Sequence, residues 1–460
     1  MSSSSGTSDY NRSIELTCPA STNDVEKQLP FYDPRFEVKF ADDNDLRSPK
    51  SLSTWRKWVI VTVVSTTSLC VACTSSVYTG TTAQVEAEFE TSRTIATLGL
   101  SIFVVGLGLG PMILAPLSEF YGRRPVYVIS MLMFVIWIIP CAVANNIATL
   151  LIARFFNGFA GAAFLSVAAG TVGDLFSRSN LQKPMMLYTA TPFLGPELGP
   201  LIGDFINYNT NWRWTFWTML IWSGVQWLLI VFFVPETYMP VLLRKEAIKT
   251  RKETNDTRWH APIEKIKRSI SGTILRSCQR PFLLMIYEPM VLLLCLFCAV
   301  ILGILYLFFD AFNIVFENNH GFKLWQVGLS FVGIMVGMII GILTDPIWKK
   351  NYSRLVKHHQ ETTGMVGGSE PEFRLPSAIV GAPLVVIGVL WFGWTQYSFI
   401  HWIVPIVGSA FFGCGIILVF SGVWTFLVDS YPTYAASALA ANSFARSMFA
   451  AAFPLFGPAI

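Results

Sequence analysis

The chain has 460 residues, of which 53% are hydrophobic and 13% are charged, against about 25% charged in soluble domains. The net charge of +4 is too small and too dispersed to indicate a nucleic-acid partner. The apolar residues gather in runs of about 20, the length that crosses a bilayer as a helix, whereas a soluble chain would show amphipathic stripes. The sequence therefore predicts an all-α membrane protein.

Residues 1–54 are polar and rich in Ser, Asp and Pro, without a basic segment that leads directly into an apolar signal sequence. This composition predicts a disordered tail that stays in the cytosol. The first apolar run would then act as its own membrane-insertion signal.

Eleven apolar runs follow, six before a long basic loop and five after it. We place the spans at 56–78, 96–117, 126–144, 147–172, 185–206, 213–234, 285–309, 325–347, 376–396, 402–426 and 434–457. The expected domains are the tail, a first transmembrane half at 55–234, a cytosolic central loop at 235–284 and a second half at 285–460.

Lys and Arg are concentrated in alternate loops, including the pair Arg123–Arg124, the 235–284 loop and the pair Lys349–Lys350. The opposite loops are acidic or neutral. The positive-inside rule makes the basic side cytosolic. We therefore expect a multi-pass protein of the plasma membrane with a cytosolic N-terminus, and a vacuolar or other internal membrane is the alternative.

The short loop after the second span combines one acid with two arginines. Glu119 ends the span, and Gly122, Arg123 and Arg124 follow. Such a cluster suits a gate whose ion pairs hold one conformation and break in the other. Asp174, at the cytosolic end of the fourth span, is the expected partner. Charges that merely orient the chain would explain the arginines but not the acid.

A similar arrangement recurs between the eighth and ninth spans, where Asp345 precedes Lys349 and Lys350. Internal repetition of this kind is typical of secondary carriers, whose binding site lies between two halves. Asp345 is therefore a further candidate gate residue.

Six motifs follow one another along the chain: Ala115–Pro125, Arg154–Gly158, Gly195–Gly203, Pro235–Tyr238, Pro371–Pro376 and Phe453–Phe456. Together they resemble the major facilitator superfamily, specifically the fungal drug:proton antiporters with twelve spans. The resemblance implies a major facilitator fold with two pseudo-symmetric six-helix halves. It also places Arg154 and Asn157 in the arginine motif of the fourth span.

The chain departs from the family pattern at three points. Ala115 stands where the family usually has Gly, and Asp204 stands where the fifth-span motif normally has a second Gly. The chain also stops at Ile460, before the twelfth span of the family. We therefore expect eleven of the twelve spans.

Few ionisable residues fall inside the spans, where a charge costs roughly 2.5–3.5 kcal/mol, so each is a functional candidate. The residues assigned to the substrate and proton pathway are Arg154, Asn157, Glu197, Asp310, Asn442 and Arg446. The resemblance implies that Arg154 pairs with a carboxylate during proton uptake; the alternative is a charge satisfied by backbone carbonyls. Glu197 either binds and releases protons, because burial disfavours its charged form, or stays neutral and hydrogen-bonded.

Two further candidates lie in the second half. Asn442 and Arg446 are four residues apart and hence on one helix face, where they either face the central cavity or form a structural network. Asp310, near the outer end of the seventh span, either attracts a cationic substrate or marks the membrane interface.

The fifth span carries Gly195, Gly199 and Gly203 on one face, which lets another helix approach closely and slide. Pro196 and Pro200 interrupt the backbone hydrogen bonds and permit bending. The family resemblance favours a sealing contact between the halves that limits proton leak. Static close packing is the alternative.

We therefore predict a proton-coupled secondary transporter that exports small lipophilic or amphiphilic compounds, namely drugs, toxins or secondary metabolites, by alternating access. No G-x-x-x-x-G-K-[ST] run is present, so an ion gradient must supply the energy. We expect no cofactor, no metal, no enzymatic activity and no obligate protein partner. The alternatives are a facilitator that imports a small nutrient and a truncated, non-transporting membrane protein.

Overall fold

The computed structural model describes residues 34–39, 45, 48–177, 180–265, 270–363, 370–432 and 434–457. The predicted disordered tail at 1–54 lies mostly outside these ranges. The chain separates into two compact units. The membrane unit comprises Leu46–Tyr238 and Arg268–Ile460, and the small unit comprises Met1–Asp45 and Met239–Lys267.

The first half of the membrane unit begins with the short helix η4 (Pro49–Ser51). Its α-helices are α2 (Thr54–Ser76), α3 (Thr82–Phe89), α4 (Arg93–Tyr121), α5 (Arg123–Ala142), α6 (Ile147–Gly161), α7 (Ala163–Ser166), α8 (Ala168–Leu175), α9 (Gln182–Asn209) and α10 (Trp212–Phe233). The fourth predicted span is therefore a chain of three helices, α6 to α8.

The second half follows α12 (Ile270–Tyr287). Its helices are α13 (Pro289–Phe312), the π-helix η7 (Asn313–Asn319), α14 (Leu324–Ser330), α15 (Val332–Leu343), α16 (Asp345–Thr363), η8 (Pro371–Arg374), α17 (Pro376–Trp394), α18 (Ile403–Ser430) and α19 (Ala435–Phe456). Every predicted span is helical, and the eighth is divided into α14 and α15. The all-α prediction is confirmed.

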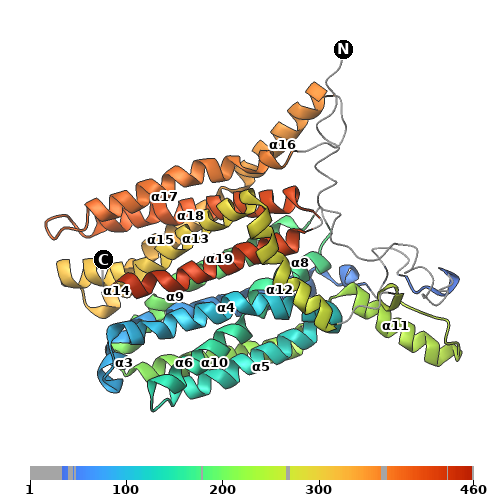
Figure 1. Cartoon of the computed structure of the whole chain (residues 1–460), viewed down its shortest axis with the longest axis horizontal. Coiled ribbons are helices and arrows are strands. Elements are labelled where there is room, and N and C mark those ends of the chain that lie inside the picture. Colours follow the sequence, from blue (N-terminus) through green and yellow to red (C-terminus); the bar gives the residue numbers. More distant parts are fainter. Residues whose placement is uncertain are drawn as a thin grey trace. The chain divides into compact units, whose positions relative to one another are not determined.

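Nine helical segments of the described chain are long and apolar enough to cross a membrane. The other two predicted spans, α9 and α19, are helices of 28 and 22 residues with more polar side chains. α9 packs against α2 and α14, while α19 lies between α13 and α4 (Figure 1). Their polar groups therefore meet other helices and not lipid alone.

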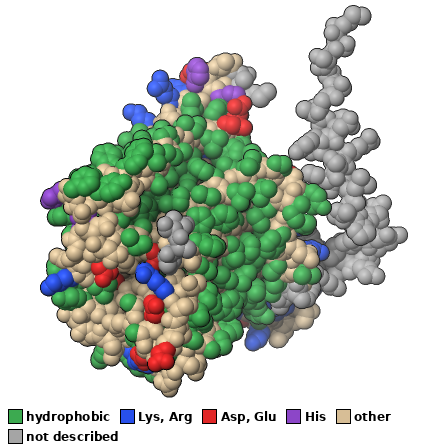
Figure 2. Space-filling view, turned by 60° about the vertical axis from the view of Figure 1, so that its left-hand side comes forward, with side chains coloured by type: hydrophobic (Ala, Val, Ile, Leu, Met, Phe, Trp, Pro, Cys, Tyr) green, Lys and Arg blue, Asp and Glu red, His purple; other side chains and the backbone are tan. Residues whose placement is uncertain are grey.

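The sides of the bundle are apolar. Figure 2 shows a wide hydrophobic area on one face, with charged side chains gathered in separate patches beside it. Large apolar side chains such as Phe232, Leu293 and Ile379 are well exposed. In water such a surface would be costly, but hydrocarbon is its natural solvent. The surface is that of a multi-pass membrane protein.

The small unit holds α11 (Met239–Thr254) and two short helices, η3 (Pro34–Phe36) and η6 (Pro262–Lys265). The amide of Val38 donates to the carbonyl of His260 at 3.0 Å, and the amide of His260 donates to Phe36 at 3.0 Å. Val38, Ala247 and Ala261 form its apolar core. The predicted central loop at 235–284 thus contains α11 in this unit and most of α12 in the other.

Candidate functional site

Arg154, in α6, is buried against the end of α2. Its Nη1 donates to the carbonyl of Thr74 at 2.9 Å and its Nη2 to Ser75 at 3.0 Å. Its Nε donates to the carbonyl of Gly99 in α4 at 3.0 Å. Because α2 ends at Ser76, the carbonyls of its last turn lack partners within the helix, and a cation there also complements the helix dipole.

Two aromatic rings complete the surroundings of Arg154. The centroids of Tyr78 and Phe103 lie 4.9 and 4.4 Å from its guanidinium carbon. No carboxylate in the described part of the chain pairs with it. The sequence left two interpretations open for Arg154: pairing with a carboxylate, or a charge satisfied by backbone carbonyls. In this conformation the structure shows the second.

Asn157, one turn further along α6, donates from Nδ2 to the carbonyl of Phe134 in α5 at 2.8 Å. The side chain is therefore held between two helices of the first half. In this conformation it faces α5, which differs from its predicted place on the substrate pathway.

The glycine face of α9 packs on α2. A Cβ on Gly195 would lie 2.4 Å from the Cβ of Ala72, and one on Gly203 would lie 2.6 Å from the carbonyl oxygen of Val77. Both helices belong to the first half. The predicted contact of this face with the opposite half is therefore not the one observed, and the glycines are explained by close packing within one half.

Gly199 gives the sharpest test of this packing. A Cβ there would lie 1.9 Å from Ser76 Oγ and 2.6 Å from the Val77 amide. Gly199→Ala should therefore lower the Tm of the detergent-solubilised protein, since overpacking costs about 1–3 kcal/mol. Gly224→Ala in α10 is the matched control, because nothing lies within 4 Å of its added Cβ. Equal Tm values for the two variants would contradict the packing.

Glu197, in α9, is 1% exposed, and neither carboxyl oxygen has a hydrogen-bond partner among the described residues. The nearby Tyr306 of α13 shares a hydrogen bond of 3.1 Å with Ser75 Oγ. The carboxyl is thus an uncompensated acid in the middle of the bundle.

A second buried acid, Asp204, lies two turns further along α9 and is 3% exposed. Its Oδ1 lies 2.0 Å from where a Cβ on Gly80 would be, and its Oδ2 lies 3.0 Å from a Cβ on Gly328. The acid therefore fills a gap between the two halves. It was noted in the sequence as a departure from the motif but not as a site residue.

Asn442 and Arg446 share a face of α19, as their spacing predicts. Trp424 of α18 contacts both: its Nε1 donates to Asn442 Oδ1 at 3.0 Å, and its ring centroid lies 4.8 Å from the Arg446 guanidinium carbon. The two residues therefore meet α18 at the level of Phe193 in α9, whose ring centroid lies 5.6 Å from that of Trp424.

The ends of the two halves opposite the basic loops are held together. Three pairs join them: Arg93 with Asp310 at 3.7 Å, Phe205 with Trp325 at 5.6 Å between centroids, and Lys323 with the Tyr208 ring at 5.9 Å. The two halves are thus in contact at the predicted outer side. Asp310 is neutralised by Arg93 here, which does not fit the attraction of a cationic substrate in this conformation.

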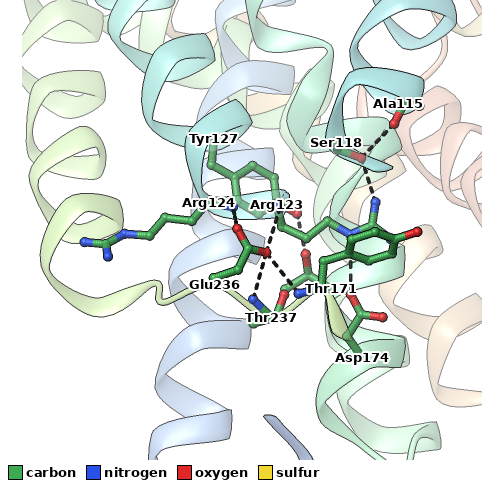
Figure 3. A network of polar contacts seen from close by, with 10 residues as sticks. Ala115, Ser118, Arg123, Arg124, Tyr127, Thr171, Asp174, Glu236 and Thr237 are labelled. Carbon is green, nitrogen blue, oxygen red and sulfur yellow. Dashed lines mark hydrogen bonds and ion pairs between the residues drawn. The ribbon is translucent and has the colours of Figure 1, made fainter. Parts of the chain in front are cut away.

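At the basic end, Arg123 is the centre of a polar network (Figure 3). Its Nε lies 3.4 Å from Asp174 Oδ2, and its Nη1 donates to Ser118 Oγ at 2.6 Å. Its guanidinium carbon lies 4.6 Å from the ring centroid of Tyr238. The expected pairing of Arg123 with Asp174 is observed, and it ties the start of α5 to the end of α8.

Glu236, which the sequence did not single out as a site residue, caps the same helix. Its Oε1 accepts from the amides of Arg123, Thr237 and Tyr238 at 2.9, 3.1 and 2.9 Å. Its Oε2 accepts from the amide of Arg124 at 3.3 Å. A carboxylate at the first turn of α5 satisfies amides that have no partner in the helix and stabilises its dipole.

Gly122 makes room for this carboxylate. Its φ of +99° lies in the region that favours glycine, and a Cβ there would stand 2.2 Å from Glu236 Oε2. The Pro235–Tyr238 motif marks Glu236 in the sequence. No local pattern, however, predicts its contact with Arg123, which is 113 residues away. The contact between Glu236 and the start of α5 thus needs the glycine for space as well as for backbone conformation.

Two predicted members of the gate lie apart from the network. Glu119 is exposed and pairs with no described cation. The Arg124 side chain points away from Glu236, and its Nη2 donates to the carbonyl of Val231 at 3.0 Å (Figure 3). Glu119 therefore does not join the two arginines in this conformation, and their cluster stays a prediction for another state of the carrier.

The second half has its own ion pair at the basic end. Arg374 Nε lies 2.7 Å from Asp429 Oδ2, and its guanidinium carbon lies 3.7 Å from the Tyr352 ring centroid. This arrangement of an arginine with an aspartate and a tyrosine ring corresponds to that of Arg123 with Asp174 and Tyr238 in the first half. Asp345, the candidate that the sequence offered in this half, pairs with Lys349 one turn along α16 at 2.6 Å. It takes no part in the Arg374–Asp429 pair.

Known proteins resemble this chain over most of its length. The "Efflux pump atB" of Aspergillus terreus is 62% identical over 425 residues, which cover 92% of this chain and 81% of that protein. The "Probable drug/proton antiporter YHK8" of Saccharomyces cerevisiae is 38% identical over 452 residues, covering 98% and 86%. A multidrug transporter of Aspergillus fumigatus, mdrA, is 41% identical over 92% of this chain and 68% of its own length.

Among solved structures, the xylose transporter XylE from E. coli in a partially occluded inward-open conformation shares the fold with a TM-score of 0.61. The match covers 87% of this chain and 92% of XylE at 17% identity. Residues 64–454 match the Major Facilitator Superfamily. The chain therefore belongs to the Major Facilitator Superfamily and is closely related to fungal efflux pumps and drug/proton antiporters.

Proposed function

We propose that this protein exports small lipophilic or amphiphilic compounds, such as drugs or secondary metabolites, in exchange for protons. Its similarity to an efflux pump and to a probable drug/proton antiporter supports this assignment. The import of a nutrient is the weaker alternative, since one of these relatives is an efflux pump and the other a probable drug/proton antiporter. Membership of a transporter family agrees with the expectation that the chain is not an enzyme.

The observation that carries the proposal is the buried Glu197 carboxyl without a hydrogen-bond partner. A carboxylate in such a place pays a large desolvation cost, so the site favours the protonated form. A change in its exposure to either side of the membrane would then drive proton uptake or release. This links the protonation of Glu197 to the conformation of the bundle.

The proposed cycle is alternating access between residues 55–234 and 285–460, connected by the 235–284 loop. The pairs at the outer side would break when the carrier faces outward, and the Arg123–Asp174 and Arg374–Asp429 pairs would hold each half during the motion. The protein would work as a monomer in the plasma membrane with a cytosolic N-terminus, without nucleic acid or an obligate protein partner.

Transport in inside-out vesicles tests this function. With an acidic lumen, the wild-type protein should accumulate labelled lipophilic compounds, and Glu197→Gln should lose this gradient-driven accumulation because it cannot release a proton. The variant should keep the exchange of substrate down its own gradient. Asp204→Asn serves as the comparison for the second buried acid.

Three results would contradict the proposal. If Glu197→Gln keeps full gradient-driven accumulation, a group other than Glu197 must carry the proton. If Asp204→Asn then loses the accumulation, Asp204 is that group. Accumulation that depends on an alkaline lumen would favour import with protons. No transport by the wild-type protein would favour the non-transporting alternative.

A further inference from the structure

Three aromatic rings stack at the level of Arg446, where α9 of the first half meets α18 of the second. The Phe193 centroid lies 5.4 Å from that of Phe420 at an interplanar angle of 23°, and 5.6 Å from that of Trp424 at 32°. Phe420 and Trp424 are 5.8 Å apart at 13°. The rings are nearly parallel, so they present flat faces on which a further aromatic ring can stack.

Arg446 lies against this stack with its charge uncompensated. Its guanidinium carbon lies 5.2 Å from the Phe420 centroid and 4.8 Å from that of Trp424. No carboxylate in the described chain pairs with it, and its Nε has no hydrogen-bond partner. Arg446 is half-buried, and cation–π contact, worth about 0.5–2 kcal/mol, supplies neither a counter-charge nor a hydrogen-bond acceptor.

Asn442 places a second donor beside the first. Its Oδ1 is occupied by Trp424, but its Nδ2 has no partner among the described residues, and the residue is fully buried. The thiols of Cys295 and Cys298 lie against it, and a thiol is only a weak acceptor. Two donors on one helix face therefore lack a strong acceptor.

Arg154 shows what a structural arginine looks like in the same bundle. It too lies on aromatic rings, but all three of its nitrogens donate to backbone carbonyls. Arg446 has the rings without the carbonyls. Arg446 therefore differs from Arg154 in lacking hydrogen-bond acceptors, and a bound ligand can supply them.

We propose that Arg446 and Asn442, together with the stacked rings, bind an aromatic substrate that carries an anionic oxygen, such as a carboxylate or a phenolate. The ring of the substrate would stack on Phe193 or Trp424, and its oxygen would accept from Arg446 and Asn442. The inference rests on the proposed function and names the substrate class of that transporter. It also predicts discrimination against aromatic cations, which Arg446 repels.

Equilibrium binding of three matched naphthalene compounds to the purified protein tests this class. The wild-type protein should bind naphthoate about tenfold more tightly than neutral naphthamide or cationic naphthylmethylammonium, because a charge-assisted bidentate contact adds about 1.4 kcal/mol or more. Arg446→Gln should remove this preference. Arg446→Lys should keep part of it, since it keeps the charge but not the planar fork.

Two further variants separate the stack from the charge. Phe193→Leu should weaken the binding of all three compounds by a similar factor, because it removes a ring and no charge. Arg276→Gln makes the same substitution as Arg446→Gln at an exposed position of α12, and it should leave all three affinities unchanged.

Equal affinities of the wild-type protein for naphthoate and naphthamide would overturn the inference, as would no binding of any of the three. So would a preference that survives in Arg446→Gln. The wild-type comparison alone is decisive if Arg446→Gln fails to fold. The assay uses no proton gradient, so a carboxylate preference without gradient-driven transport would leave this site standing while the proposed exchange fails.

Discussion

Glu236→Ala is expected to destabilise the protein by about 2 kcal/mol, the scale of a lost charged helix cap. The change leaves four backbone amides, two of them in the first turn of α5, without their acceptor. It also frees the segment that places Tyr238 on Arg123. We expect a lower Tm in detergent together with slower transport, since the Arg123–Asp174 pair loses its support.

Glu236→Gln separates the cap from the charge. The remaining amide oxygen can still accept from the amides that Oε1 holds, so its Tm should lie between those of the wild-type protein and Glu236→Ala. Glu119→Ala is the control, because Glu119 is an exposed acid near the same loop. A Tm for Glu236→Ala equal to that of Glu119→Ala would show that the cap contributes nothing.

Arg154→Lys is expected to damage folding more than it damages coupling. The planar guanidinium of Arg154 donates to the carbonyls of Gly99, Thr74 and Ser75 at once. A lysine ammonium cannot reproduce this geometry, so some of these buried carbonyls lose their hydrogen-bond donors. Each such loss costs about 1–3 kcal/mol. We expect a strongly reduced yield of monodisperse protein and a lower Tm, measured by size-exclusion chromatography and thermal unfolding.

The opposite outcome has a clear meaning. A well-folded Arg154→Lys protein with the Tm of the wild type and no gradient-driven transport would give Arg154 the role in proton uptake that the family resemblance implies. The arginine would then leave its carbonyls in another conformation of the carrier.

The positions of the spans were predictable because hydrocarbon demands long apolar helices. The residues at which the spans end were less predictable. The seventh span was expected to end at residue 309, but α13 continues to Phe312 and then as a π-helix to Asn319. The fourth was expected as one rod, but it is divided after Gly161. These departures depend on packing against neighbouring helices, which the apolar pattern does not report.

The candidate site was predictable where its members are close in the sequence or share a motif. The shared face of Asn442 and Arg446 follows from helical spacing, and Asp174 follows from its place at a span end. Contacts between distant segments were not predictable. Glu236 reaches Arg123 across 113 residues, and Arg374 reaches Asp429 across 55. No local pattern specifies such pairs.

The polar character of α9 and α19 has a consequence for the synthesis of the chain. Each carries buried polar groups, such as Asp204 and Asn442, that a lone helix would have to expose to lipid. α9 emerges after its neighbour α2, and α19 emerges after both α4 and α13. Earlier helices are therefore already present to shelter part of the polar surface of each late helix. The side of Asp204 that meets Gly328 of α14 is covered only when the second half follows.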